Sequence, residues 1–214
     1  MITSFDQQKS IISGIIGELR NVEVQGDSLR FRRNLERFGE LCAYEISKTL
    51  DYKKSDVTSP LGTASVDIHS DEIVLCAVLR AAIPMHQGFL NIFDRAENAF
   101  AAVYRMDNKS GGFEIHLDYF TSPSLDNKVL IIIDPMLATG STIEQVLESV
   151  KKYGTPKKIH VASAIASVIG INKIKRLYNH VDVWVGAIDE ELTAKAYIVP
   201  GLGDAGDLAY GSKS

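Results

Sequence analysis

The stretch Val129-Leu-Ile-Ile-Ile-Asp-Pro-Met-Leu-Ala-Thr-Gly-Ser-Thr142 joins a run of aliphatic residues to a short polar turn. The aliphatic run has the length of a strand, and a continuous apolar run is typical of a strand buried on both faces of a parallel sheet. The turn contains Thr139 and Gly140, and the pattern after it predicts a helix that begins near Ser141. The stretch therefore predicts a strand-turn-helix unit of an α/β domain.

Similar apolar runs alternate with helical patterns from residue 73 onwards. This alternation predicts βαβ units, and hence a mostly parallel, twisted sheet flanked by helices. The expected strands cover residues 73–79, 99–104, 129–133, 159–165 and 181–187, and the expected helices cover residues 84–93, 141–153 and 169–178. Ligands of open α/β sheets bind at the carboxyl ends of the strands, so the functional residues are expected there.

The rest of the chain predicts additions to this unit rather than a second domain. With 214 residues, the chain has the length of a single domain, residues 1–214. Residues 1–52 carry apolar residues at helical spacing, which predicts an N-terminal helical segment. Turn-forming residues at 108–112, followed by alternating apolar and polar residues, predict a β-hairpin arm over residues 106–121, and this arm is a candidate lid.

The composition disfavours several kinds of protein. Lys and Arg total 23 against 27 Asp and Glu, so the net charge of −4 gives no support to nucleic-acid binding. No apolar run approaches the roughly 20 residues of a membrane span, and no signal sequence is evident, so a cytoplasmic protein is expected. Cys42 and Cys76 lie in apolar stretches, which predicts free thiols, and the histidine spacing predicts no metal site.

The turn after Asp134 suits a phosphate group. Its backbone N–H groups and hydroxyls can converge on one point, and the N-terminus of the following helix adds partial positive charge. A Walker loop needs a lysine before its Ser or Thr, and Gly140-Ser141 contains none, so a nucleotide triphosphatase is disfavoured. The alternative is an ordinary connection whose helix is capped by Ser141.

Two arginines and one glycine-rich run extend this candidate site. Arg80 and Arg105 each follow an expected strand, so both guanidinium groups can reach the crevice and bind a diphosphate. The run Tyr197-Ile-Val-Pro-Gly-Leu-Gly-Asp-Ala-Gly-Asp207 offers backbone donors and acceptors that suit the edge of a planar heterocycle. The alternatives are a surface cation for each arginine and a surface turn for the glycine-rich run.

Two of these motifs, VLIIIDPMLATGST at 129–142 and YIVPGLGDAGD at 197–207, resemble those of the uracil phosphoribosyltransferase family. The likeness also covers FRRNLERFGELCAYE at 31–45, VLRA at 78–81, YR at 104–105 and VDVWVGAIDEEL from residue 181, so it spans most of the chain. The resemblance implies a type I phosphoribosyltransferase-like fold. It also implies transfer of the 5-phosphoribosyl group from 5-phospho-α-D-ribose 1-diphosphate (PRPP) to uracil, which gives UMP and diphosphate in pyrimidine salvage.

The resemblance further implies that PRPP carries Mg²⁺, that GTP is a candidate allosteric effector, and that the chain forms a homo-oligomer, a dimer or a tetramer. The expected PRPP site comprises Arg80, Arg105, Asp134, Pro135, Met136, Leu137, Ala138, Thr139, Gly140, Ser141, Thr142 and Asp204. The expected catalytic residues are Asp134, Arg105 and Asp204. The expected uracil site comprises Ile198, Gly203, Asp204 and Ala205, within a base-binding segment of residues 190–214.

In this scheme, Arg80 and Arg105 bind the diphosphate, Asp134 binds the ribose hydroxyls, and residues 138–142 bind the 5-phosphate. Four departures from the family pattern lie in or near these motifs: Ala82-Ile-Pro-Met-His-Gln87 replaces a glycine-rich stretch, Ser141 replaces a glycine, Val168-Ile169 replaces Pro-Glu, and Leu208 replaces an arginine.

Two alternatives stay open, namely a regulatory protein of the same fold that senses pyrimidine nucleotides, and a phosphoribosyltransferase for another base. Phosphoribosyltransferases for other bases commonly have two acidic residues where this chain has Asp134-Pro135, so the proline favours uracil.

Overall fold

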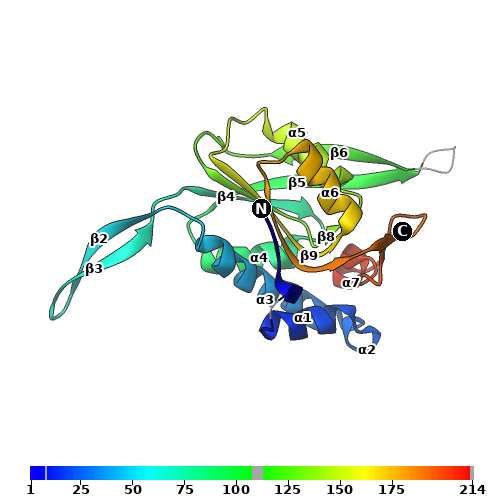
Figure 1. Cartoon of the computed structure of the whole chain (residues 1–214), viewed down its shortest axis with the longest axis horizontal. Coiled ribbons are helices and arrows are strands. Elements are labelled where there is room, and N and C mark those ends of the chain that lie inside the picture. Colours follow the sequence, from blue (N-terminus) through cyan, green and yellow to red (C-terminus); the bar gives the residue numbers. More distant parts are fainter. Residues whose placement is uncertain (8, 108–112, 213–214) are drawn as a thin grey trace.

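A mostly parallel sheet forms the centre of the protein (Figure 1). The computed structural model describes residues 1–7, 9–107 and 113–212. In this part of the chain the sheet has eight strands, and seven of them follow the order β1-β10-β9-β7-β4-β5-β6, while β8 pairs with β9. Every neighbouring pair is parallel except β5 with β6. The strands are β1 Ile2–Ser4, β4 Ile73–Leu79, β5 Glu97–Asp107, β6 Phe113–Thr121, β7 Val129–Ile133, β8 Met136–Leu137, β9 Lys158–Ser167 and β10 Asp182–Asp189.

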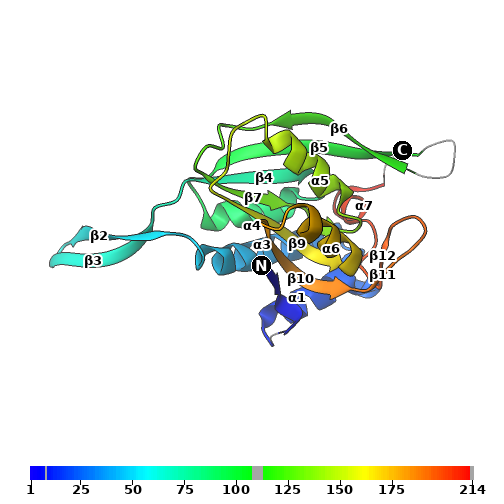
Figure 2. The ribbon, with the colours of Figure 1, turned by 45° about the horizontal axis from the view of Figure 1, so that its top comes forward.

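Helices cover both faces of the sheet, as Figures 1 and 2 show. On one face lie α1 Ile11–Arg20, α3 Ser28–Ser47, α4 Ile83–Ile92 and α7 Ala205–Tyr210, and on the other lie α5 Ser141–Val150 and α6 Val168–Leu177. The strand β7 supplies both cores, because Ile131 and Ile133 pack with the first group of helices, whereas Leu130 and Ile132 pack with the second. This two-sided burial explains why the strand has no polar residue.

The expected fold class is confirmed. Strands β4 and β7 have the predicted bounds, and the other predicted strands and helices are shifted by only a few residues at their ends. The antiparallel pairing of β5 with β6 agrees with the predicted hairpin, while its turn at 108–112 lies outside the described residues. The division into helical, lid and base-binding segments stays a prediction.

Several elements were not predicted, and the two largest departures are an N-terminal strand and a second hairpin. Residues 1–52 were expected to be helical, but β1 pairs with the edge strand β10, and the amino group of Met1 donates to Asp182 Oδ1 at 2.5 Å. A three-residue strand is too short to leave a periodic signal, so only the pairing edge reveals it. The short helices η1 Phe5–Gln7 and α2 Val22–Gln25 complete this segment.

The second unpredicted element is the antiparallel hairpin of β2 Tyr52–Ser59 and β3 Gly62–His69. It projects away from the sheet (Figure 1), and nearly all of its residues are exposed, with Leu61 at its tip fully so. An isolated two-stranded hairpin gains little stability from its own contacts. This arm therefore presents a large, unpacked surface.

Two further findings concern the expectations from composition. Cys42 and Cys76 are free and buried, as predicted. Among the described residues, no helix is both long enough and apolar enough to cross a membrane, and no group of three His, Cys, Asp or Glu side chains could hold a metal ion.

Candidate active site

Asp134 stands at the carboxyl end of β7, in the middle of the sheet. Its backbone N–H donates to the carbonyl oxygen of Ala162 at 3.1 Å, which continues the pairing of β7 with β9. The carboxyl group is buried, and its Oδ1 accepts one hydrogen bond, at 3.3 Å from the backbone N–H of Met136. Burial raises the pKa of Asp134 to about 7, against the lowering effect of this hydrogen bond. The site thus holds a buried carboxyl group with free acceptor capacity at its centre.

The loop of residues 135–142 is attached to β9 at its start. The carbonyl oxygen of Pro135 accepts from the backbone N–H groups of Ala164 and Ile165, both at 3.0 Å. Met136 and Leu137 then form β8 and pair with β9. The polypeptide therefore stays paired with β9 until Leu137, before it reaches the residues predicted to bind the 5-phosphate.

The end of this loop leads into α5 through Gly140, whose φ of +77° is a left-handed conformation that glycine adopts without a steric penalty. Ser141 is the first residue of α5, and its backbone N–H donates to Thr139 Oγ1 at 3.3 Å. The two hydroxyl oxygens of Thr139 and Ser141 lie 3.1 Å apart. Hydroxyls and N–H groups thus gather at a helix N-terminus, which is the arrangement that favours a phosphate dianion.

The first turn of α6 supports the loop from behind, a contact that the sequence did not reveal. Ser167 Oγ donates to the carbonyl oxygen of Ala138 at 2.5 Å and accepts from the N–H of Gly170 at 2.9 Å. A methyl group on Gly170 would lie 2.5 Å from the same carbonyl oxygen, so only glycine allows this approach. A glycine at the start of a predicted helix was the single signal available.

Arg80 and Asp134 leave the same end of adjacent strands, because β4 and β7 are neighbours with Ala77 opposite Ile133. Arg80 Nη2 donates to Asp207 Oδ1 at 2.9 Å and to the carbonyl oxygen of Gly211 at 2.6 Å. Its Nε is buried and has no hydrogen-bond partner among the described residues. A buried donor of this kind is available to an acceptor on a ligand.

The residues after Arg80 explain one of the departures from the family pattern. Residues 83–87 form the first half of α4, with Pro84 in its first turn, where proline is well tolerated. Pro84, Met85 and His86 are buried, and His86 Nε2 lies 2.7 Å from Asn98 Oδ1. The larger side chains of this stretch therefore fill the interior beside the site.

Arg105 is the predicted site residue that the structure describes least. Its backbone lies on β5 and pairs with Ile115 of β6, while its side chain lies outside the described part of the chain. Its role in binding a diphosphate stays a prediction.

The glycine-rich run near the C-terminus folds beside Arg80. Residues Ile198–Val199 form β12, which pairs with β11 Glu191–Leu192, and the Val199-Pro200 peptide bond is cis. Asp204 caps α7, because its Oδ1 accepts from the N–H of Asp207 at 3.0 Å. A methyl group on Gly206 would lie 3.7 Å from Arg80 Nε, so the run reaches the guanidinium group directly. Figures 1 and 2 show α7 beyond the ends of β4 and β7.

Among the residues predicted to bind uracil, Ile198 and Ala205 are buried, and Gly203 has a φ of +93°. An ion pair that the sequence did not reveal holds this run in place. Asp189 accepts from both terminal nitrogens of Arg20, at 2.7 and 2.8 Å, and from the N–H of Gly201 at 2.9 Å.

The comparisons with known proteins agree with this arrangement. The family model described as uracil phosphoribosyltransferase matches residues 7–212. The chain belongs to the uracil phosphoribosyltransferase family. It is 48% identical to a uracil phosphoribosyltransferase from Porphyromonas gingivalis, with 96% of each chain covered, and 41% identical to one from Pyrococcus furiosus, with 98% of this chain and 90% of the relative covered. The solved structure of the AQ2163 protein from Aquifex aeolicus superposes with a TM-score of 0.89 at 31% identity, covering 99% and 98% of the two chains.

Proposed function

We infer that the chain transfers the 5-phosphoribosyl group of PRPP to uracil and releases UMP and diphosphate. Its membership of the uracil phosphoribosyltransferase family supports this reaction. One observation from the structure carries the inference furthest. The buried Asp134 and the loop of residues 135–142 leave the sheet at the same end as Arg80, which itself contacts the C-terminal run.

Different residues of the candidate site can bind different parts of PRPP. The N–H groups and hydroxyls of residues 138–142 bind the 5-phosphate at the start of α5. Asp134 accepts hydrogen bonds from the ribose hydroxyls, which replace the water that its burial excludes. Arg80 and Arg105 bind the diphosphate, and a guanidinium group has the fixed donors that suit it.

The reaction breaks the bond between the anomeric carbon and the diphosphate oxygen, and forms a bond from that carbon to a ring nitrogen of uracil. The proton of that nitrogen is released to water or to the departing diphosphate. Positive charge develops on the sugar while negative charge builds on the leaving diphosphate. The arginines stabilise the leaving group, and Asp134 and Asp204 stabilise the sugar. We propose that PRPP carries Mg²⁺, which would neutralise part of the negative charge on the diphosphate beside the arginines. No covalent nucleophile is needed.

We propose that the C-terminal run reads the base. Uracil presents a carbonyl, an N–H and a second carbonyl along one edge, and the backbone groups around Ile198, Gly203, Asp204 and Ala205 can pair with that pattern. Because Asp204 is fixed as the cap of α7, the base segment and the Arg80 turn are joined through Asp207. Binding of the base to this run therefore helps to position Arg80, which faces the leaving diphosphate.

We also propose that the chain forms a homo-oligomer. The exposed hairpin β2–β3 supports this, since a surface that packs on nothing within one chain suits contact with a second copy. Light scattering on the intact chain and on a variant lacking residues 52–69 tests this.

Two buried free thiols support a cytoplasmic location. The β5–β6 hairpin remains a candidate lid, and GTP a candidate effector.

The test is to mix the purified protein with Mg²⁺, PRPP and single bases, and to follow nucleotide formation. UMP from uracil, with no nucleotide from cytosine, hypoxanthine or guanine, is the expected result. Nucleotide from another base would contradict the substrate assignment. Binding of UMP without turnover under any of these conditions would instead favour a regulatory protein of the same fold.

A further inference from the structure

The loop of residues 135–142, which is the phosphate loop of the proposed function, contains no cationic side chain of its own, but α6 brings one to it. Lys173 Nζ donates to Ser141 Oγ at 2.9 Å and forms an ion pair with Glu144 Oε2 at 2.6 Å. The Lys173 side chain is about three-quarters buried, with 25% of it exposed. Ser141 and Glu144 both belong to the first turn of α5, so the ammonium group lies at the helix N-terminus that is expected to bind the 5-phosphate.

The position of Lys173 is fixed by the contacts that attach α6 to the loop. Ser167 and Gly170 both touch the carbonyl oxygen of Ala138, as described above. Lys173 follows Gly170 by three residues, which places it one helical turn further along the same side of α6. Its ammonium group is therefore held by a rigid element rather than by a flexible loop, as positioning of a ligand requires.

The contact with Ser141 determines how that hydroxyl can act. An ammonium group has donors only, so Ser141 Oγ must accept from Lys173. The proton of Ser141 is then left for another acceptor, such as an oxygen of the 5-phosphate. Ser141 is also the position where the chain departs from the glycine of the family pattern. Glycine at this position would give Lys173 no hydroxyl to contact.

The contact with Glu144 has an electrostatic consequence. A carboxylate in the first turn of a helix is favourable to the helix itself, but it repels a phosphate that binds at the same helix end. Lys173 pairs with this carboxylate and lowers its repulsion. Removal of the lysine would expose the phosphate site to an uncompensated negative charge.

We propose that Lys173 is a positioning residue for the 5-phosphate of the donor, which it serves by orienting the hydroxyl of Ser141 and by neutralising Glu144. The proposal rests on the proposed function for the identity of the donor, and on the geometry of α5 and α6 for the role of the lysine. The ligand chemistry is that of a phosphate monoester, as distinct from the diphosphate at the other end of PRPP.

The experiment measures binding of two probes to the full chain by titration calorimetry. Ribose 5-phosphate carries the 5-phosphate alone, and inorganic diphosphate represents the leaving group. Lys173→Met is expected to raise the Kd for ribose 5-phosphate about tenfold, on the scale of one charge-assisted hydrogen bond, and to leave the Kd for diphosphate unchanged. In the steady state, the KM for PRPP rises while kcat at saturating PRPP stays within about twofold.

Three further variants separate the two parts of the role. Lys173→Met combined with Glu144→Gln should recover part of the affinity for ribose 5-phosphate, because the repelling charge is gone. Ser141→Gly should weaken binding by itself, and Lys173→Met should then add less than it does in the wild-type chain. Lys151→Met removes a lysine of an exposed pair with Glu148 on the same helix, and serves as the matched control with unchanged binding.

Equal loss of affinity for both probes, or no loss for ribose 5-phosphate in a folded Lys173→Met variant, would overturn the proposal. Thermal unfolding followed by circular dichroism shows whether each variant is folded. If the chain made no UMP while Lys173→Met still weakened ribose 5-phosphate binding alone, the proposed function would fail and the role of Lys173 would stand.

Discussion

Asp134 and His160 are two buried titratable groups on the neighbouring strands β7 and β9, and they differ in how the fold treats them. Burial favours the neutral form of each, so it raises the pKa of Asp134 to about 7 and lowers the pKa of His160 to about 4. His160 Nδ1 accepts from Trp184 Nε1 at 3.0 Å inside the core, whereas the Asp134 carboxyl accepts one backbone N–H at the end of the sheet. The fold supplies His160 Nδ1 with a neighbouring donor, although its Nε2 has no hydrogen-bond partner among the described residues. It leaves the Asp134 carboxyl with acceptor capacity for a ligand.

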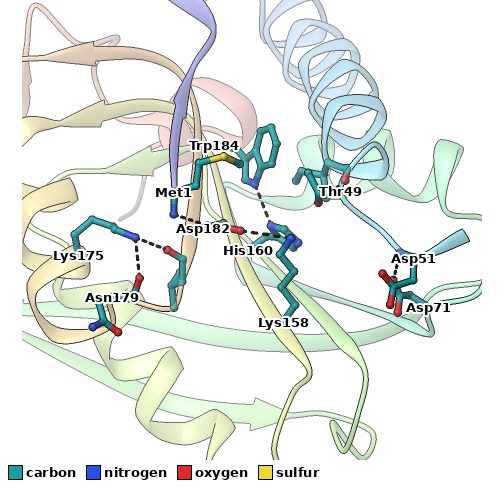
Figure 3. A network of polar contacts seen from close by, with 12 residues as sticks. Met1, Thr49, Asp51, Asp71, Lys158, His160, Lys175, Asn179, Asp182 and Trp184 are labelled. Carbon is teal, nitrogen blue, oxygen red and sulfur yellow. Dashed lines mark hydrogen bonds and ion pairs between the residues drawn. The ribbon is translucent and has the colours of Figure 1, made fainter.

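The surroundings of the two groups reinforce this difference. Figure 3 shows charges beside His160 that are already paired, since Asp182 binds the amino group of Met1 at 2.5 Å and lies 3.6 Å from Lys158. The ammonium group of Lys175 is likewise occupied, by the carbonyl oxygens of Asn179 and Val181. Around Asp134 lie the start of the phosphate loop and the turn of Arg80, whose Nε has no described partner. His160 Nε2 is also buried without a hydrogen-bond partner among the described residues, so an unpaired polar atom does not by itself mark the site. The two regions differ in that the charges around His160 are paired within the protein, whereas the Asp134 carboxyl keeps acceptor capacity at the end of the sheet.

Asp134→Asn is the substitution with the largest expected effect on the site. It removes the charge of the carboxylate but keeps its shape, so turnover is expected to fall about 100-fold or more.

The same substitution is expected to raise the stability of the folded chain at high pH. The folded pKa is above the unfolded value of 3.8, so the wild-type chain loses stability as pH rises from about 4 to about 7, by up to about 4 kcal/mol. The asparagine variant should escape this loss and be more stable at pH 8, as urea titrations at several pH values would measure.

The exposed Asp94 provides the control for this prediction, because Asp94→Asn makes the same change outside the site and should leave the turnover unchanged. An Asp134→Asn variant that was less stable than the wild-type chain at pH 8 would contradict the comparison. It would mean that the charged carboxylate is stabilised by the fold itself.

His160→Asn tests the other side of the comparison. The folded pKa of His160 is below the unfolded value of 6.5, so the unfolded chain binds more protons between about pH 4 and 6.5. The wild-type chain therefore loses stability as pH falls through this range, by up to about 3 kcal/mol. The asparagine Oδ1 can still accept from Trp184, and the variant should show a flatter acid limb in the same urea titrations. Turnover near pH 8 should be retained.

His180 is exposed, so His180→Asn is the matched control for the removal of a histidine outside the core. An unchanged slope in His160→Asn would show that another group governs acid unfolding.

The sequence predicted the part of the site that is local along the chain. The strand, the turn and the helix start between Val129 and Thr142 are consecutive, so apolar run length and turn chemistry were sufficient to predict them. The contacts that support this turn come from Ser167, Gly170 and Lys173, which meet it because β7 and β9 are adjacent in the sheet. Local sequence patterns do not determine which strands lie side by side in a sheet, so these contacts could not be predicted.

The same reasoning applies to the ion pair of Arg20 with Asp189, which joins α1 to the end of β10 across 169 residues of sequence. The hairpin β2–β3 escaped prediction for another reason. Almost none of its side chains is buried, so no core imposes an alternation of apolar and polar residues on it. Neither its length nor its position would have been deduced from hydrophobic periodicity.

Gly170→Ala tests how closely the site region depends on α6. The new methyl group would lie 2.5 Å from the carbonyl oxygen of Ala138 and 2.8 Å from that of Leu137, so the loop must move. The expected cost is about 2 kcal/mol of unfolding free energy, together with a higher KM for PRPP. Gly14→Ala is the matched control, because its methyl group has no neighbour within 4 Å and it should stabilise α1 slightly. If Gly170→Ala kept the wild-type KM for PRPP, the position of the phosphate loop would not depend on its contact with α6.

Ser163→Ala has the smallest expected effect and bears on the boundary between the two regions. Ser163 lies on β9, three residues beyond His160, and its buried Oγ has no hydrogen-bond partner among the described residues. Removing an unsatisfied hydroxyl should raise the free energy of unfolding by about 1 kcal/mol. Ser167→Ala, four residues further along the strand, should lower it, because that hydroxyl both donates to Ala138 and accepts from Gly170.

Kinetics on Ser163→Ala decide to which region this hydroxyl belongs. If the free energy of unfolding rises and turnover stays at the wild-type level, the Ser163 hydroxyl only destabilises the core and does not contact a ligand. If stability rises while the KM for PRPP or uracil also rises, the unpaired hydroxyl is a ligand contact, and the site extends from the end of β7 onto β9. Ser163 would then resemble Arg80, whose unpaired Nε faces the site, and would differ from His160, whose unpaired Nε2 lies in the core.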